Sequence, residues 1–205
     1  MTVAATSAGE LELAGWRRRV AELYAAVRQA PTPQDGHALW RDGRDRLFQE
    51  HPNSPLAADD PLRGGLPYAP DDPQLRWELA VQPAEADRRV SIKAAPGETT
   101  RLRRVGDLTL PAPIDQTVAV WWLEQYRGGL FVPIRDHTAG TTSYGGGRYL
   151  IDTAKGADLG GRDGHLTIDL NCLYHPSCRY DPQWQCPLAP ADNVIAATID
   201  VGEQL

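Results

Sequence analysis

The sequence predicts a mainly β fold, an antiparallel β-barrel or sandwich, with two helices at its N-terminus. Two amphipathic helical stretches open the chain and end near residue 52. From residue 75 onward, apolar residues recur at every second position in about nine short segments, with no helical pattern between them. Many short strands at short intervals are typical of antiparallel barrels and sandwiches. We therefore expect a helical segment over residues 1–52 and a β domain over residues 53–205, joined in one compact unit.

The two helices are predicted from their apolar spacing and from the residues at their ends. Over residues 11–29, apolar side chains recur at intervals of three and four, which is typical of an amphipathic helix. The apolar positions are Trp16, Val20, Leu23, Tyr24 and Val27. Pro31 and Pro33 end this helix, and a second begins near Asp35, a favourable N-cap, and ends at His51.

The strands follow a connector over residues 52–73 that is rich in Pro, Gly and Asp. Beyond it, apolar and polar residues alternate, or form short apolar runs rich in β-formers, as half-buried and buried strands do. The predicted strands are residues 77–81, 90–92, 101–103, 108–110, 118–123, 130–134, 149–153, 166–171 and 194–201.

Composition limits the classes of function. The formal net charge is −6 over 205 residues, with acids and bases intermixed, whereas nucleic-acid binding needs a clustered basic face. The one basic run, residues 17–19, is predicted to be a solvated helix face. No stretch approaches the roughly 18 apolar residues of a membrane-spanning helix. Residues 1–10 lack the pattern of an export signal, so we expect a cytoplasmic protein with reduced cysteines. The sequence predicts no oligomeric state.

Reactive side chains concentrate between Arg135 and Asn193, and we expect any function to lie there. Four stretches carry them: residues 135–140, 144–149, 169–178 and 186–190. The first follows a predicted strand and the second leads into the next one. This placement predicts that their side chains lie near strand ends.

These stretches resemble the pattern of the domain-of-unknown-function 1684 family, a group of uncharacterised bacterial proteins. The matching positions are Arg135, Asp136, Thr138, Gly140, Tyr144, Gly145, Gly147, Arg148, Tyr149, Leu150, Asp169, Asn171, Tyr174, Pro176, Cys178, Cys186, Pro187, Leu188, Pro190, Gly202 and Glu203. The resemblance extends over roughly residues 40–203. It implies no activity, because the family has none assigned.

The chain departs from the family pattern at four positions within these motifs. His137 stands where the family has Ala, and His175 stands where it has Asn. Cys172 and Ala139 also differ. The gain of two histidines inside an otherwise matching set of motifs indicates a divergent member with an altered site.

The leading hypothesis is a small-molecule enzyme of bacterial metabolism, with a pocket of His, Asp and Arg at the ends of the barrel strands and no specified reaction. A histidine oriented by a carboxylate is a common general base, and arginines hold anionic groups. The candidate catalytic residues are His137, His175, Asp136 and Asp169. The candidate substrate-binding residues are Arg135, Arg148, Tyr144, Asn171 and Tyr174.

A metal site is a second hypothesis. Four ligands that suit structural zinc lie within fifteen positions: Cys172, His175, Cys178 and Cys186. His137, Asp169 and His175 would instead suit non-haem iron or catalytic zinc. Cofactor-free chemistry is equally open, with Cys172 or Cys178 as a nucleophile beside His175 or as a small buried apolar residue.

The alternative to an enzyme is a non-catalytic ligand-binding or interaction module. In that case the charged residues of the motifs form a buried hydrogen-bonded network, and an apolar pocket lined by Trp121, Trp122 and the tyrosines binds the ligand. Residues 145–147 are predicted to be a tight turn that needs positive φ, in preference to a phosphate-binding nest.

Overall fold

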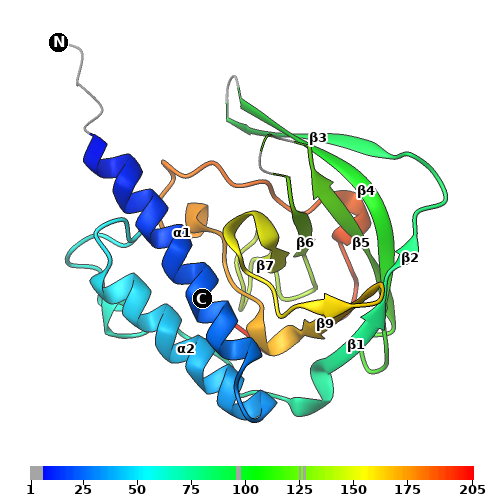
Figure 1. The fold of residues 1–205 in the computed structure, drawn as a ribbon, viewed down its shortest axis with the longest axis horizontal. Coiled ribbons are helices and arrows are strands. Elements are labelled where there is room, and N and C mark those ends of the chain that lie inside the picture. The colour runs from blue at the N-terminus through cyan, green and yellow to red at the C-terminus, as the bar shows by residue number, and fades with distance from the viewer. Residues whose placement is uncertain (1–6, 96–97, 125, 127) are drawn as a thin grey trace.

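The structure is a computed structural model, which describes residues 7–95, 98–124, 126 and 128–205. Two antiparallel sheets, not closed into a barrel, form its β part (Figure 1). Among the described residues, one sheet has the order β2-β4-β5-β6-β7 with β3 also paired to β4, and the other has the order β1-β9-β8. The strands are β1 (Arg76–Ala80), β2 (Gln82–Pro83), β3 (Arg89–Ala95), β4 (Glu98–Leu110), β5 (Gln116–Leu123), β6 (Leu130–Ile134), β7 (Arg148–Asp152), β8 (Gly161–Arg162) and β9 (His165–Asp169). The mainly β fold is confirmed, in its sandwich-like form.

Most predicted strands coincide with observed ones, and β4 unites two of them. The segments around Leu102 and Leu108 lie on this single strand, whose register with β5 shifts between Arg104 and Gly106. A Cβ at Gly106 would lie 2.5 Å from the carbonyl oxygen of Gln82 on β2. Glycine therefore allows β2 to approach the irregular point of β4.

The predicted strand over residues 194–201 is wrong. Backbone hydrogen bonds join the beginning of this segment to residues 135–137. Further along, however, the carbonyls of Ile199 and Val201 accept hydrogen bonds from the side chain of Arg148. The segment is therefore held by a buried guanidinium, not by a regular β ladder.

The two helices are α1 (Ser7–Arg28) and α2 (Pro33–Glu50). Thr32, not Asp35, is the N-cap of α2, because its side chain accepts a hydrogen bond from the backbone N–H of Asp35. Pro33 does not end the first helix but occupies the first turn of the second, where its missing N–H costs nothing. Among the described residues, no helix is both long and apolar enough to cross a membrane.

The two helices share a hydrophobic core with the larger sheet. They lie side by side in Figure 1, and Tyr24 of α1 and Trp40 of α2 belong to the same buried cluster as Trp121 and Tyr149. The indole N–H of Trp40 donates to the hydroxyl of Tyr24 at 3.0 Å. A separate cluster of aliphatic residues fills the space between the two sheets. The helices thus cover the end of the β structure where the motif-bearing loops lie.

Short 3-10 helices occur mainly in the connections. They are η1 (Pro61–Gly64), η2 (Pro73–Leu75), η3 (Thr153–Lys155), η4 (Leu170–Cys172), η5 (Ser177–Arg179) and η6 (Ala191–Asn193). Of these, η3 and η5 place residues beside the cavity described below.

Candidate functional site

Arg148, at the start of β7, forms the centre of a buried polar network. Its Nη2 lies 2.6 Å from Oδ2 of Asp136 and also donates to the carbonyl of Ile199 at 2.8 Å. Its Nη1 donates to the carbonyls of Val201 and Glu203. Only 1% of the residue is exposed. Both terminal nitrogens are therefore committed to the protein itself, which leaves Arg148 unsuited to holding a substrate anion.

Asp136 is saturated in the same way. Its Oδ1 accepts hydrogen bonds from the backbone N–H and the hydroxyl of Thr138, and its Oδ2 accepts from Arg148. The Thr138 hydroxyl is in turn 2.7 Å from the hydroxyl of Ser143. The carboxylate thus fixes the loop that follows β6.

Glu203 forms a second buried centre near the C-terminus. Its Oε2 lies 2.7 Å from Nη2 of Arg44 on α2 and accepts the backbone N–H of His175 at 2.8 Å. Its Oε1 accepts the hydroxyl of Tyr180. Burial raises the pKa of Glu203, and the charge of Arg44 opposes this effect. The Arg44 guanidinium also lies over the ring of Tyr174, so this pair ties α2 to the motif loops.

His175 is a buried, neutral side chain. Its Nε2 accepts the backbone N–H of Tyr144 at 3.1 Å, which places the ring proton on Nδ1, 3.8 Å from Oε1 of Glu203. Burial, together with the positive charges of Arg148 and Arg44, lowers the pKa of His175 to about 3. A histidine with so low a pKa and only 2% exposure is a poor general base at neutral pH.

The other predicted polar residues lie in different surroundings. His137 and Arg135 are exposed, and the Nε of Arg135 donates to the carbonyl of Gly145 at 2.8 Å. Trp121 is fully buried and its indole N–H donates a hydrogen bond to Oδ1 of Asn193, whereas Trp122 is partly exposed. The structure therefore does not bring the two histidines into one environment.

Asp169 and Asn171 form a third local network. Oδ1 of Asp169 accepts the backbone and side-chain N–H groups of Asn171, and Oδ2 lies 2.9 Å from Nη1 of Arg76. Oδ1 of Asn171 accepts the backbone N–H of Asp72. These contacts join the end of β9 to the segment before β1.

The four proposed zinc ligands do not form a site. Within the described ranges, no three His, Cys, Asp or Glu side chains are grouped so that they could hold a metal ion, and this applies equally to His137, Asp169 and His175. Cys172 is buried, and burial raises the pKa of its thiol. Only Cys178 and Cys186 lie together, with the Cys178 N–H 3.4 Å from Sγ of Cys186.

Residues 145–147 form a tight turn, in agreement with the sequence. The N–H of Gly147 donates to the carbonyl of Tyr144 at 2.8 Å, and Gly147 has φ +87°. A Cβ at Gly147 would lie 2.5 Å from the carbonyl oxygen of Ile134.

Gly147→Ala is expected to lower the free energy of unfolding by at least about 2 kcal/mol, because the turn needs both positive φ and a close backbone approach. Gly145→Ala is the matched control. Its Cβ would meet nothing closer than Gly140 Cα at 3.8 Å, and its φ is not positive. Urea unfolding of both variants measures the difference, and equal stabilities would contradict the role given to Gly147.

A groove lies between α1 and the segment that follows η5. It consists of two adjoining cavities, of about 370 and about 410 Å³, within the size range of small-molecule sites. Both cavities are lined by Arg17, Lys155, Gln185 and Cys186. These two cavities together are called the groove below.

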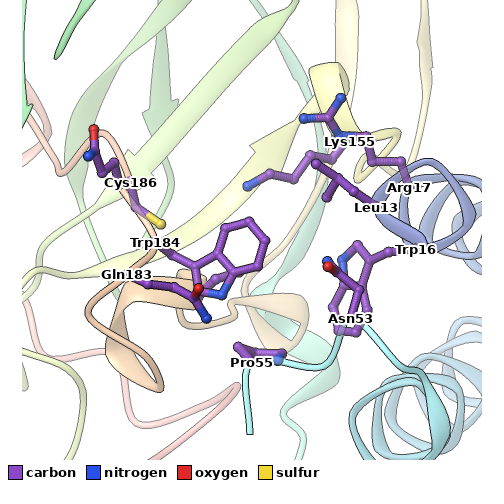
Figure 2. A pocket seen from close by; sticks show the side chains of 11 residues that line it. Leu13, Trp16, Arg17, Asn53, Pro55, Lys155, Gln183, Trp184 and Cys186 are labelled. Carbon is purple, nitrogen blue, oxygen red and sulfur yellow. The ribbon is translucent and has the colours of Figure 1, made fainter. Parts of the chain in front are cut away.

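Aromatic and charged side chains of distant segments meet in the groove. Figure 2 shows Trp16 of α1 on one side of the first cavity and Trp184 on the other, with the Lys155 ammonium directed toward Trp184 and the Cys186 sulfur on the side of Trp184 away from Trp16. Nζ of Lys155 lies 3.0 Å from Oδ2 of Asp152, so the two side chains form an ion pair. Burial alone would lower the pKa of Lys155, but the attraction of Asp152 and Cys186 raises it overall, so the ammonium stays charged.

Sequence reasoning identified only Cys186 among these residues as chemically relevant. Arg17 was assigned to a solvated helix face, but it is only partly exposed and lines both cavities. In the sequence, the spacing of Trp16 predicts only that it packs on the apolar face of a helix. No sequence pattern marks Trp184 or Lys155 as functional. These residues come from three separate segments, so no local spacing could have grouped them.

The protein is therefore a sandwich-like β protein covered by two helices. Two buried ion pairs, Arg148–Asp136 and Arg44–Glu203, hold its C-terminal segment in place. The chain belongs to the family described as "Protein of unknown function (DUF1684)", whose model matches residues 64–204. A solved structure with the same fold is an uncharacterised protein of Haloarcula marismortui, determined in solution by NMR. It is 32% identical, with a TM-score of 0.54, over 80% of this chain and 90% of that chain. No curated protein matches the chain.

Proposed function

We propose that this chain is a small-molecule-binding protein and that the groove is its binding site. The observation that carries the proposal is the convergence of Trp16, Trp184, Lys155 and Cys186 on one cavity of ligand size. Pockets with apolar aromatic walls and a few polar groups are the usual form of small-molecule sites. By contrast, the polar motif residues Arg148, Asp136 and Glu203 form hydrogen bonds and ion pairs with other protein groups, as expected of a structural network.

The walls of the groove favour a planar ligand that carries a hydrogen-bond acceptor or an anionic group. The Trp16 and Trp184 indoles provide flat apolar surfaces for the planar part. The indole N–H of Trp184 is buried and has no acceptor among the described residues, so an acceptor on the ligand would satisfy it. The Lys155 ammonium, which also lines the cavity, would favour negative charge on the ligand.

An enzyme that uses His137 and His175 receives less support from the geometry. One histidine is exposed, the other is buried with its Nε2 already occupied, and neither lines the groove. We also expect the protein to act in the cytoplasm, where its three free thiols would stay reduced, and to bind no nucleic acid, given its net charge of −6.

The aromatic anion 8-anilinonaphthalene-1-sulfonate is a direct probe of the groove. In a titration of ¹⁵N-labelled protein followed by NMR, the indole N–H signals of Trp16 and Trp184 are expected to shift saturably. The signals of Trp77 and Trp122, which do not line the groove, are expected to stay in place. Single Trp→Phe variants assign the signals. Shifts confined to Trp77 or Trp122, or no saturable shift, would contradict the proposal.

Lys155→Met tests the charged end of the groove. Because Lys155 is partly exposed and paired with Asp152, its removal is expected to weaken probe binding by only about threefold. Arg162→Met, which removes an exposed cation on β8, is the matched control and is expected to leave the affinity unchanged.

A further inference from the structure

Cys178 and Cys186 form a close pair of thiols. The backbone N–H of Cys178 donates to Sγ of Cys186, with 3.4 Å between the nitrogen and the sulfur. Both cysteines are free, and the eight-residue separation leaves a loop between them that contains Trp184. Because a sulfur and its own backbone nitrogen are joined through only two carbons, this contact places the two sulfurs near each other.

The pair differs from the third cysteine in its position at the groove, although Cys186 is itself only 9% exposed. Cys186 lines both cavities of the groove, and Cys178 is partly exposed beside it. Cys172 is only 2% exposed and lies in the core shared by the helices and the sheet. A small polar oxidant that enters the groove therefore meets Cys186 first.

The surroundings divide the roles of the two sulfurs. The contact with Cys178 and the charge of Lys155 lower the pKa of Cys186, although burial acts in the opposite direction. The neighbouring Cys186 sulfur and burial raise the pKa of Cys178. Cys186 is thus the sulfur that more readily forms the thiolate, which is the form that attacks oxidants, and Cys178 is the thiol that can attack next.

We propose that Cys178 and Cys186 are a reversible thiol–disulfide pair that hydrogen peroxide oxidises through the groove. The Cys186 thiolate attacks one peroxide oxygen, so an S–O bond forms, the O–O bond breaks and hydroxide leaves. Cys178 then loses its proton to that hydroxide and attacks the sulfur of the sulfenic acid. The S–S bond forms, the S–O bond breaks and a second hydroxide leaves, which takes up from the solvent the proton that Cys186 released on forming its thiolate. Two thiols and one peroxide give one disulfide and two waters, which balances the two electrons transferred.

Oxidation would fix the segment that carries Trp184. Residues 179–185 lie between the two sulfurs and provide one wall of the first cavity. A disulfide would close this segment into a covalent loop and thereby alter the shape of the groove. The redox pair itself does not depend on the ligand proposed above, since it requires only the two sulfurs and access for peroxide.

The test is to treat the reduced protein with a small excess of hydrogen peroxide and to count free thiols after unfolding. The count is expected to fall from three to one, with a Cys178–Cys186 linked peptide in the mass spectrum, and to return to three after dithiothreitol. A count that stays at three, a link to Cys172, or irreversible loss of Cys186 as sulfinic acid would each overturn the proposal.

Two variants separate the roles of the sulfurs. Cys178→Ser removes the second sulfur, so the sulfenic acid of Cys186 is expected to persist and to be trapped by dimedone, whereas Cys172→Ala is expected to form the disulfide as the natural chain does. Dimedone labelling on Cys178 in a Cys186→Ser variant, at a rate equal to that of Cys186, would refute the assignment of Cys186 as the attacking thiolate.

Discussion

Arg148→Met is expected to lower the free energy of unfolding by about 3–5 kcal/mol, the range for removal of one partner from a buried ion pair. The variant would leave the Asp136 carboxylate buried without its cation and would leave the carbonyls of Ile199, Val201 and Glu203 without their donor. Guanidinium-chloride unfolding, with the midpoint and slope compared with those of the natural chain, measures the effect.

Two further variants show whether the loss comes from the unpaired charge. Arg135→Met removes a neighbouring but exposed arginine and is expected to change stability by no more than about 0.5 kcal/mol. The double variant Arg148→Met with Asp136→Leu removes the buried carboxylate as well and is expected to recover part of the lost stability. If the double variant is less stable than Arg148→Met alone, the unpaired charge is not the cause.

The role of Arg148 also explains where sequence reasoning succeeded and where it stopped. The helices and most strands followed from apolar spacing, because burial of a face imposes that spacing on the chain. Residues 194–201 have the same apolar character and were predicted to be a strand. Their carbonyls bond to a side chain that is distant in sequence, and no local pattern can reveal such a partner.

The same limit applies to the candidate site. Arg148, Asp136 and His175 are the residue types that active sites use, and the sequence identified them on that basis. Whether such groups meet a substrate or one another depends on burial, which the motif does not encode. In the structure they lie among backbone carbonyls and each other. The association of Cys178 with Cys186 was foreseen only within a proposed zinc site, and the structure retains the two sulfurs without the other ligands.

The stability of the protein is expected to fall as the pH drops below about 6.5, in part because His175 is buried as the neutral form. In the unfolded chain His175 has the ordinary pKa of about 6.5, whereas in the folded chain burial and nearby arginines lower it to about 3. Between these two pH values the unfolded state binds more protons than the folded state. The free energy of unfolding therefore increases as the pH rises and decreases as the pH falls. At pH 5 this single group is expected to cost roughly 2 kcal/mol relative to pH 7.5.

The contribution of His175 is measured as a difference between two proteins. Urea unfolding of the natural chain and of His175→Asn, each from pH 7.5 to pH 5, is expected to show a smaller loss in the variant by roughly 2 kcal/mol. Other groups that titrate in this range act on both proteins alike. The Glu203 carboxylate, 3.8 Å from Nδ1 of His175, would favour protonation, but Arg44 and Tyr180 already share its charge. His137→Asn, at the exposed histidine, is the matched control and is expected to keep the pH dependence of the natural chain. Parallel curves for the natural chain and His175→Asn would mean that His175 gains a proton in the folded protein as easily as in the unfolded one, and that Glu203 compensates its charge.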